Sequence, residues 1–363
     1  MTAKHPMDPW GSTEIIVDDK LFKEFGLSQF KEKDYLNHYL FERGFVIAHR
    51  DFEKISDSIK QNKPFAQMTG IASSGPLHLG HKVDVDLFLF FKKLGAKSFF
   101  AICDIDAYTS RPDNKVPSMK KAKEIAVENL SDILALGVEE KDTYVQSQKD
   151  PRYYEFAFEL SKKITENEFR AIYGHMNLGK VSANLLQYAD ILHQQLPEYL
   201  GPMPTITGIG LEQDPHARAT RDLAKRLQYN FVSPSFIYFK HQAGLQEGKK
   251  MSSSEPDTAI FLRDTEKEIK KKINKAFSGG RPTIEEHRKL GGIPEIDKSF
   301  EILNYHHPDT KFVKKVYEEY KSGKMLTGEL KSITAEFLVK FLKEHNEKVN
   351  CYRETAQKLV YKP

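Results

Sequence analysis

The stretch that decides the fold is FAQMTGIASSGPLHLGHKVDVDLFLFFKKLG, residues 65–95. It opens with a short apolar run, Phe65 to Thr69, which is typical of a buried strand. The small residues from Gly70 to Pro76 then indicate a tight turn. From Val83 onward, apolar residues recur at helical spacing until Gly95 supplies a helix stop. A strand, a turn and a helix in this order predict the first unit of a parallel sheet wrapped by helices.

The same alternation continues toward the C-terminus. Further strands are predicted at 98–103, 143–146, 205–209 and 236–239, and helices at 120–136 and 216–227. The predicted class is α/β, with a Rossmann-like parallel sheet that carries helices on both faces.

After Asp264 the pattern predicts helices only. The first of them is rich in lysine, and the last carries an amphipathic run from Leu326 to Leu342. We therefore expect a Rossmann-like catalytic domain over residues 61–262 and an all-helical domain over 263–363. Residues 1–60 are taken as an N-terminal extension, although their pattern also fits a part of the main domain.

Composition sets broad limits on the protein. A chain of 363 residues favours about two domains. Its hydrophobic fraction of 39% and charged fraction of 29% are ordinary for a soluble protein. Apolar runs are too short to span a bilayer, and the first residues lack the apolar stretch of a secretory signal. We expect a cytoplasmic protein with no membrane partner.

Charge and cysteine content exclude further classes. The formal net charge of +4 permits an RNA partner but does not indicate one by itself. The two cysteines, Cys103 and Cys351, lie far apart and have no Cys-x-x-Cys partner. Neither a disulfide framework nor a thiolate zinc site is therefore predicted. We expect both thiols to be reduced, with Cys103 acting as a small apolar residue at a strand end.

The first motif that can carry chemistry is GPLHLGH, residues 75–81. His78 and His81 are three residues apart at the start of a predicted helix, so they share one face. A helix N-terminus attracts anions, and Gly80 would let a flat ring or a phosphate approach the backbone. Histidine N–H groups directed at an α-phosphate would stabilise charge during nucleotidyl transfer. The alternative is that the histidines cap a turn and the glycine serves packing.

The second motif is GKKMSSS, residues 248–254, which follows the last predicted strand. A flexible loop that carries Lys250 and several hydroxyls suits a leaving pyrophosphate. Taken alone, the same composition fits a solvated linker between domains.

The two motifs together resemble the paired motifs of class I aminoacyl-tRNA synthetases, which are similar to HIGH and KMSKS. Ser253 is a departure, because it stands where the family pattern has its second lysine. The resemblance implies ATP as a substrate and Mg²⁺ held mainly by the ATP phosphates. It implies catalytic roles for His78, His81 and Lys250, and an ATP site formed by Gly80, Gly210, Glu212, Lys250, Met251 and Ser252.

Residues between and beyond these motifs are similar to the tryptophanyl branch of the family, of the archaeal and eukaryotic kind. The segments that carry this resemblance are Asp8-Pro9-Trp10, His49-Arg50-Asp51, Glu212-Gln213-Asp214-Pro215, Thr220-Arg221-Asp222, Phe277-Ser278-Gly279-Gly280-Arg281, Glu285-Glu286-His287-Arg288 and Leu326-Thr327-Gly328-Glu329-Leu330. The implied function is activation of L-tryptophan with ATP and its transfer to tRNA(Trp).

Carried over by position, the resemblance assigns an amino-acid pocket. It puts Gln213, Gln187 and Asp106 near the substrate ammonium, and Glu212 near the ribose. Carboxylate and amide oxygens are suitable acceptors for a cationic amine. As alternatives, Gln213 and Glu212 could cap the following helix, and Asp106 could end a strand.

The selector of the side chain is predicted from a departure. Met68 and Ala101 stand where the eukaryotic branch reads the indole N–H with a tyrosine and a glutamine, and neither accepts that hydrogen bond well. The segment around Asp190 is similar to the bacterial branch, in which an aspartate accepts the indole proton. We therefore predict Asp190 as the selector. Another departure is Ile71, at the position of a eukaryotic arginine near ATP.

Two further expectations concern metal and RNA. Asp104 and Asp106 could form a carboxylate pair, but a third ligand at a suitable spacing is missing from the sequence, so no protein-bound metal is predicted. By resemblance, the helical domain approaches the tRNA anticodon with Arg281 near its bases. Pro282 replaces a common eukaryotic aspartate there, and the lysine-rich helix could equally be a solvated face.

Three rival functions remain open at this point. They are a tyrosyl-tRNA synthetase, a small-molecule nucleotidyltransferase that shares only the histidine motif, and a silent RNA-binding relative. Members of the family are usually homodimers, which is implied by the resemblance alone.

Overall fold

The computed structural model describes residues 19–30, 36–174, 177–248, 251 and 255–362. Its centre is a seven-stranded sheet in the order β1-β2-β7-β6-β3-β4-β5. The strands are β1 (Ser28–Gln29), β2 (Val46–Arg50), β3 (Ala66–Ala72), β4 (Lys97–Cys103), β5 (Thr143–Val145), β6 (Thr205–Gly210) and β7 (Ser235–Phe239). The five strands β3 to β7 are parallel, and β2 and β1 extend one edge in antiparallel orientation. The predicted α/β class and its strands are confirmed.

Several boundaries differ from the sequence prediction by one or two residues, and that of β3 differs by more. Strand β3 continues to Ala72, through part of the predicted turn. Gly70 pairs with Ala101 of β4, and a Cβ on Gly70 would lie 2.7 Å from the Cβ of Ala101. Gly70 is therefore needed for close strand packing rather than for a turn.

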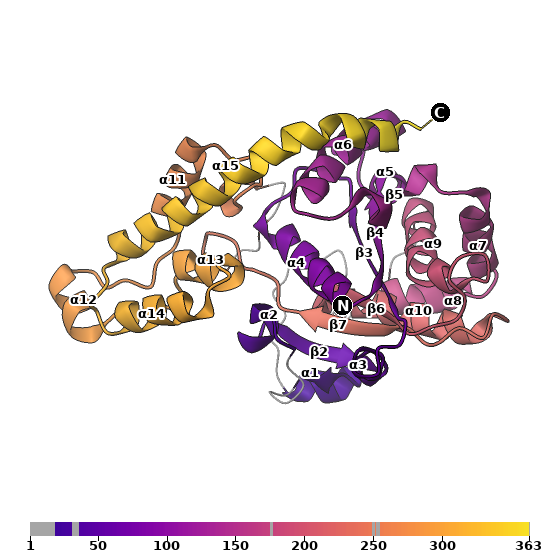
Figure 1. Ribbon diagram of the computed structural model, residues 1–363, viewed down its shortest axis with the longest axis horizontal. Helices are drawn as coiled ribbons and strands as arrows, with labels where there is room; N and C mark the ends of the chain where they lie inside the picture. Colours follow the sequence, from indigo (N-terminus) through magenta and orange to yellow (C-terminus); the bar gives the residue numbers. More distant parts are fainter. Residues whose placement is uncertain (1–18, 31–35, 175–176, 249–250, 252–254, 363) are drawn as a thin grey trace.

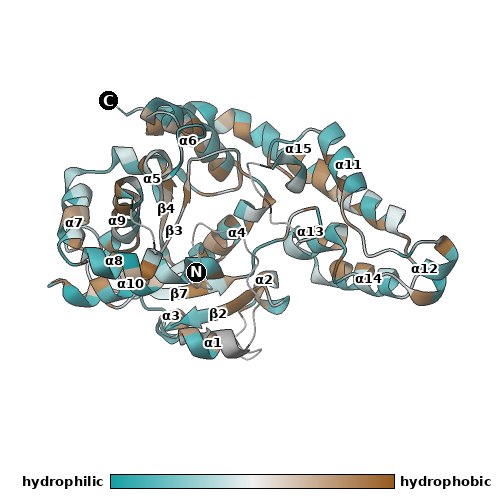
Figure 2. Ribbon diagram, turned by 180° about the vertical axis from the view of Figure 1, so that it is seen from behind, coloured by the Kyte–Doolittle hydropathy of each residue, from teal (hydrophilic) through white to brown (hydrophobic). Residues whose placement is uncertain are grey.

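Helices cover both faces of the sheet, as the sequence predicts (Figure 1). Helices α3 (Phe52–Lys60), α4 (Leu79–Lys93) and α6 (Met119–Ala135) lie on one face, and α1 (Asp19–Phe25), α9 (Leu178–Leu192) and α10 (Asp214–Arg226) lie on the other. Successive side chains of β7 point to opposite faces of the sheet. Ile237 packs with α4 on one face, while Phe236 and Tyr238 pack toward α10 on the other. Figure 2 shows the apolar colouring in the central strands and in α9, and mixed colouring on outer helices such as α15.

Shorter helices fill the connections of the α/β part. They are α2 (Tyr39–Glu42), α5 (Asp104–Ser110), α7 (Pro151–Ser161) and α8 (Glu166–Tyr173). Within the described residues, every helix is too short or too polar to cross a membrane.

The described part of the first 60 residues joins the main sheet. Strand β2 pairs with β7, and Arg50 at its end donates to both carboxylate oxygens of Asp214 at 2.8 and 3.0 Å. Arg221 of α10 pairs with Asp51 at 2.9 Å. The sequence left open whether this segment is an extension or a part of the main domain, and these contacts agree with the second alternative. The domain boundary at residue 60 stays a prediction.

The C-terminal region is helical, as expected. It contains α11 (Glu266–Lys275), α12 (Ile284–Leu290), α13 (Lys298–His306), α14 (Thr310–Lys321) and α15 (Thr327–Val360). Helix α15 has 34 residues and is longer than the amphipathic run in the sequence. It runs back from the helical extension to lie along α6 (Figure 1). One apolar cluster therefore holds Leu130 of α6 together with Leu342 and Val360 of α15.

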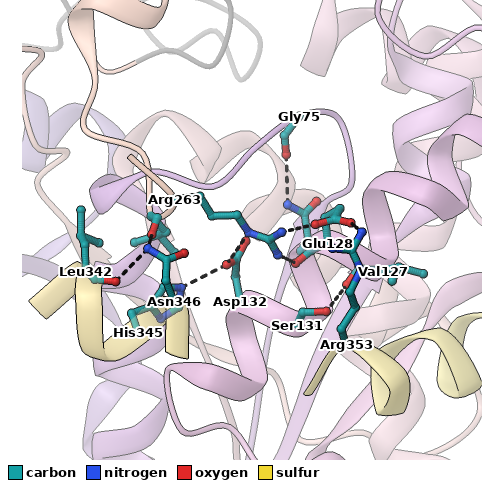
Figure 3. A network of polar contacts seen from close by, with 12 residues as sticks. Gly75, Val127, Glu128, Ser131, Asp132, Arg263, Leu342, His345, Asn346 and Arg353 are labelled. Carbon is teal, nitrogen blue, oxygen red and sulfur yellow. Dashed lines mark hydrogen bonds and ion pairs between the residues drawn. The ribbon is translucent and has the colours of Figure 1, made fainter. Parts of the chain in front are cut away.

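A polar network reinforces this contact (Figure 3). Arg263, which precedes α11, donates to Asp132 at 3.1 Å and also binds Glu128, both on α6. From α15, His345 lies 3.0 Å from the same Asp132, and Arg353 binds Glu128 at 2.6 Å. The side chains of His345 and Asp132 are almost fully buried. The network thus joins α6, α15 and the connection between the two predicted domains.

Candidate active site

A cavity of about 260 Å³ opens at the carboxyl ends of the parallel strands. It lies where β3 is flanked by β4 on one side and β6 on the other, the switch point at which open α/β sheets bind ligands. Its walls come from β3, β4, β6, α4, α5, α9 and the start of α10. Lining residues include Met68, Thr69, Asp84, Cys103, Asp106, Asn184, Gln187, Asp190, Gly208, Gly210, Glu212, Gln213 and His241.

The cavity brings together the residues predicted for the amino acid. Met68, Asp106, Gln187, Asp190 and Gln213 all line it, although they come from three different elements and the turn before α10. Of the predicted ATP residues, Gly210 and Glu212 line the same cavity. Their assigned roles stay predictions, but their spatial association is a property of the fold.

The two histidines of the first motif form the start of α4. The backbone N–H of Gly80 donates to Nδ1 of His78 at 3.2 Å, and the backbone N–H of His78 donates to Nδ1 of His81 at 3.1 Å. The centroids of the two imidazole rings are 4.0 Å apart. A neutral imidazole whose Nδ1 accepts a hydrogen bond carries its proton on Nε2. Both rings therefore present an Nε2–H donor.

Electrostatics keep these rings neutral. Burial lowers the pKa of His78 to about 2, and the neighbouring His81 and His241 act in the same direction. Burial also lowers the pKa of His81 to about 4, again with a contribution from His241. Because His241 lines the cavity, the histidine pair is electrostatically linked to it.

Gly80 has a local structural reason as well as a predicted role in ATP binding. A Cβ at this position would lie 2.9 Å from Cε1 of His78. Glycine therefore leaves room for the His78 ring to fold over the first turn, which agrees with the capping alternative.

The chain segment after the second motif binds directly to the first motif. Leu79 N–H donates to the carbonyl of Ile260 at 3.0 Å, and Leu262 N–H donates to the carbonyl of Leu77 at 2.9 Å. His78 and Phe261 form an antiparallel bridge between these bonds. Lys250 and Ser252 lie outside the described residues, whereas Met251 is half-buried and packs against the core of α4 and α6. The fold thus holds residues 260–262 beside the histidines.

Glu212 and His241 form a polar pair at the cavity wall. Nε2 of His241 lies 2.5 Å from Oε1 of Glu212. A Cβ on Gly210 would lie 2.1 Å from the His241 Nε2 and 2.5 Å from the Glu212 Oε1. Gly210 is therefore required for this pair, a reason that the sequence alone did not reveal.

Asp190 is the most extensively hydrogen-bonded acid of the cavity. Its Oδ1 accepts from the phenols of Tyr144 at 2.7 Å and Tyr153 at 2.6 Å. Its Oδ2 accepts from the amide of Gln146 at 2.7 Å and lies 3.9 Å from the Cys103 thiol. Burial raises the pKa of Asp190 to about 6, against the lowering effect of these three hydrogen bonds.

The possible carboxylate pair of α5 is divided by the structure. Asp104 is fully buried, and its Oδ1 accepts the backbone N–H of Ser147 at 3.0 Å. Asp106 lines the cavity, and its Oδ1 accepts from Ser110 at 2.8 Å. Across the part of the chain that the structure describes, His, Cys, Asp and Glu side chains nowhere gather in threes as metal ligands. The expectation of no protein-bound metal stays a prediction.

Sequence reasoning missed several ionisable residues of the cavity, among them Asp84 and His241. Asp84 follows His81 by one helical turn, and burial raises its pKa to about 7. His241 follows the last strand of the sheet by two residues. Helical spacing from the histidines could have identified Asp84, and a position after the carboxyl end of a strand could have identified His241.

Arg281 and the other C-terminal motifs lie in the helical region. The Nε of Arg281 donates to the carbonyl of Gly291 at 2.9 Å, so part of its guanidinium holds the loop itself. Cβ atoms on Gly279 and Gly280 would lie 2.0 Å from the Ile293 carbonyl and 2.3 Å from the Thr327 hydroxyl. These motif residues therefore pack the loops between α11, α12 and α15 together; an RNA contact by Arg281 stays a prediction.

Cys103 behaves as the sequence predicted. It ends β4 and is buried, while Cys351 is exposed, and both thiols are free.

The fold agrees with that of known proteins. Residues 60–343 match the family of class I tRNA synthetases for tryptophan and tyrosine (W and Y). The match spans most of the chain, so the chain belongs to that family.

Within the family, this chain groups with the tryptophanyl-tRNA synthetases of archaeal type. The tryptophan–tRNA ligase of Aeropyrum pernix is 40% identical over 374 residues, which cover 99% of each chain. That of Methanocaldococcus jannaschii is 40% identical over 371 residues and 98% of each chain. The crystal structure of the tryptophanyl-tRNA synthetase from A. pernix K1 superposes with a TM-score of 0.89 at 39% identity, covering 98% of this chain and 100% of that one.

Proposed function

We propose that the chain is a tryptophan–tRNA ligase, which activates L-tryptophan with ATP and transfers it to tRNA(Trp), releasing pyrophosphate and AMP. The observation that carries this function is the cavity at the switch point. It gathers Asp106, Gln187, Asp190 and Gln213 together with His241, whose charge acts on the histidine pair of α4. The full-length similarity to tryptophan–tRNA ligases supports the same amino acid.

In the first step, the tryptophan carboxylate attacks the α-phosphorus of ATP. Asp106, Gln187 and Gln213 offer acceptors for the substrate ammonium, and Met68 forms part of the apolar wall. Asp190 accepts the indole N–H. A buried acceptor of this kind discriminates against phenylalanine, which would leave the carboxylate without its partner.

The ATP is held from the other side. The Nε2–H groups of His78 and His81 donate to the α-phosphate as charge builds on its oxygens. Glu212 accepts from the ribose hydroxyls, and Lys250 with Met251 and Ser252 contacts the leaving pyrophosphate. Mg²⁺ that enters with ATP neutralises phosphate charge, and the chain's own contribution is to orient the phosphates.

The second step needs the terminal adenosine of tRNA in the same cavity. We assign the helical region, with Arg281, to the anticodon end of the tRNA. By analogy with the family we also propose a homodimer located in the cytoplasm.

A pyrophosphate-exchange panel tests the function directly. The purified chain is assayed with ATP, labelled pyrophosphate and, in turn, tryptophan, tyrosine and phenylalanine, followed by charging of tRNA(Trp). We expect tryptophan-dependent exchange and charging. Exchange that depends on tyrosine instead would identify a tyrosyl enzyme, and absence of any amino-acid-dependent exchange would reject adenylate chemistry.

A further inference from the structure

A lysine ammonium lies among three tyrosine rings next to Asp190. Nζ of Lys149 is 5.0 Å from the ring centroid of Tyr144, 5.7 Å from that of Tyr153 and 4.7 Å from that of Tyr199. The Lys149 side chain is only 12% exposed. We call Lys149, Tyr144, Tyr153 and Tyr199 the lysine cage. Among the described residues, Asp190 and Cys103 line the substrate cavity, and the members of the lysine cage do not.

The acceptor capacity of Asp190 shows where a substrate can bind. A carboxylate has about four lone-pair directions, two on each oxygen. The phenols of Tyr144 and Tyr153 use both directions of Oδ1. Gln146 uses one direction of Oδ2, and the other faces the Cys103 thiol at 3.9 Å, a long and weak contact. The acceptor direction for an indole N–H is therefore on Oδ2, at the cavity wall shared with Cys103.

The lysine cage strengthens the two phenol donors. A cation over an aromatic face is attracted by the ring electrons, and the attraction grows when water is excluded. Burial, and then the charge of Asp190, raise the pKa of both phenols well above its ordinary value. Electron density drawn toward Nζ acts in the opposite direction and makes each phenolic O–H a better donor to Asp190. Burial lowers the pKa of Lys149, whereas the charge of Asp150 and, to a smaller extent, that of Asp190 raise it. Lys149 and Asp190 therefore also interact through space.

Two further ionisable groups face the lysine cage, His193 and Asp150. The ring of His193 lies 5.0 to 5.5 Å from all three tyrosine rings. Burial lowers its pKa to about 3, so it is neutral at physiological pH. Asp150 is 3.7 Å from Lys149, but its carboxylate also accepts from Tyr199 at 2.8 Å and lies partly in solvent. Within the described part of the chain, Lys149 is a cation that lies over the rings of both phenols that hold Asp190.

We propose that Lys149, through Tyr144 and Tyr153, is a positioning residue that keeps the Asp190 carboxylate ionised and oriented toward the indole N–H of tryptophan. This inference rests on the proposed function of the cavity. It adds a determinant of amino-acid specificity that never touches the substrate. Loss of the lysine should therefore weaken recognition of the N–H group and leave binding of the rest of the substrate largely intact.

The test compares tryptophan with benzothienylalanine, the analogue in which sulfur replaces the indole N–H. For Lys149→Met, we expect kcat/KM of exchange with tryptophan to fall by roughly ten- to thirtyfold, mainly through an increase in KM. This size corresponds to the loss of a desolvated cation–π contact. The same variant should change kcat/KM for the analogue by less than about threefold. Tyr153→Phe removes a donor to Asp190 and should show the same selective loss. Lys149→Arg keeps a cation over the rings and should restore much of the preference for tryptophan.

Two controls separate this role from a structural one. Lys162→Met changes an exposed lysine at the end of α7 and should leave both substrates unaffected. The midpoint of thermal unfolding is measured for every variant, and where Lys149→Met unfolds at the assay temperature, Tyr153→Phe decides the outcome. Equal losses for tryptophan and the analogue would overturn the proposal. Failure of the unmodified chain to exchange with tryptophan would instead reject the proposed function itself.

Discussion

At the scale of single residues, the histidine pair of α4 is defined by its protonation state. Backbone N–H groups occupy Nδ1 of both rings, and burial keeps both rings neutral. The pair can therefore donate two Nε2–H bonds without adding positive charge to the cavity. Such donors act on a developing oxyanion rather than on the bound amino acid.

Replacement of His81 tests this assignment. For His81→Ala we expect kcat of exchange to fall by about 10²- to 10³-fold, with KM for tryptophan nearly unchanged, because a donor aimed at the transition state is lost. Steady-state exchange kinetics measure both constants. His307→Ala, at a half-buried histidine outside the cavity, serves as the control. A loss confined to KM for tryptophan would contradict the proposed role.

The ionisation of Asp190 predicts a pH dependence. Burial raises its pKa to about 6, so the carboxylate is ionised above this pH. In the role we propose for it, the ionised carboxylate accepts the indole N–H. As the pH falls through about 6, protonation removes the acceptor, and kcat/KM for tryptophan should decrease by up to about tenfold per pH unit. Exchange measured from pH 5 to 8 checks this.

Two variants identify the group that titrates. Asp190→Asn should give a lower and flatter profile. Asp84, whose pKa burial raises to about 7, lines the same cavity, so Asp84→Asn should keep the step near pH 6. If the step disappears with Asp84→Asn and persists with Asp190→Asn, the titrating group is Asp84 and our assignment to Asp190 is wrong.

At the scale of secondary-structure elements, several motifs that resemble the family prove to hold elements together. Arg50 of β2 binds Asp214 at the start of α10, and the Tyr238 phenol of β7 donates to the same carboxylate at 2.6 Å. Asp214 is fully buried and follows Gln213 directly. Because Gln213 lines the cavity, the ion pair of Arg50 and Asp214 stabilises the adjoining part of the cavity wall.

Removal of Arg50 should destabilise the whole domain. Arg50→Met leaves the buried Asp214 with Arg218 as its remaining cation, and we expect the free energy of unfolding to drop by about 3 kcal/mol. Urea unfolding measures the change. Arg170→Met, which breaks an exposed pair with Glu166, should have little effect. Equal effects of both variants would show that the Asp214 pair is not a major support.

At the scale of the whole molecule, the helical region and the sheet domain share one core. Helix α15 returns to α6, and Ala356 and Val360 are fully buried against the α6 side of the molecule. The Arg263 network adds polar contacts between the same parts (Figure 3). Asn129 of α6 donates to the Gly75 carbonyl at 3.0 Å, which links this contact to the loop before the histidines.

We therefore expect the two predicted domains to unfold together. Ala356→Asp places a charge in the shared core and should lower the midpoint of thermal unfolding for the catalytic part as well as for α15. Calorimetry measures the unfolding transitions of the whole chain, and tryptophan-dependent exchange after heating reports whether the catalytic part is still folded. Cys351→Asp, at an exposed position of the same helix, should be nearly neutral. A variant that melts the helical region alone, with exchange preserved, would show independent domains.

The sequence by itself determined the local elements and the chemical motifs. Apolar periodicity and helix signals depend on neighbouring residues, so the strands of the sheet, the start of α4 at His78 and the helical character after Asp264 were all predictable. The residues of the amino-acid pocket were assigned by resemblance, and every residue assigned to the amino-acid substrate lines the cavity.

Only the tertiary structure decided how those residues are supported. The sequence could not show that β2 joins the sheet beside β7, that α15 returns to α6, or that Gly210 makes room for the Glu212–His241 pair. Nor could it show that phenols from β5 and α7 hold Asp190, with Lys149 over their rings. The physical reason is that each of these contacts joins residues far apart in the chain, and only the packing of the elements brings their side chains together.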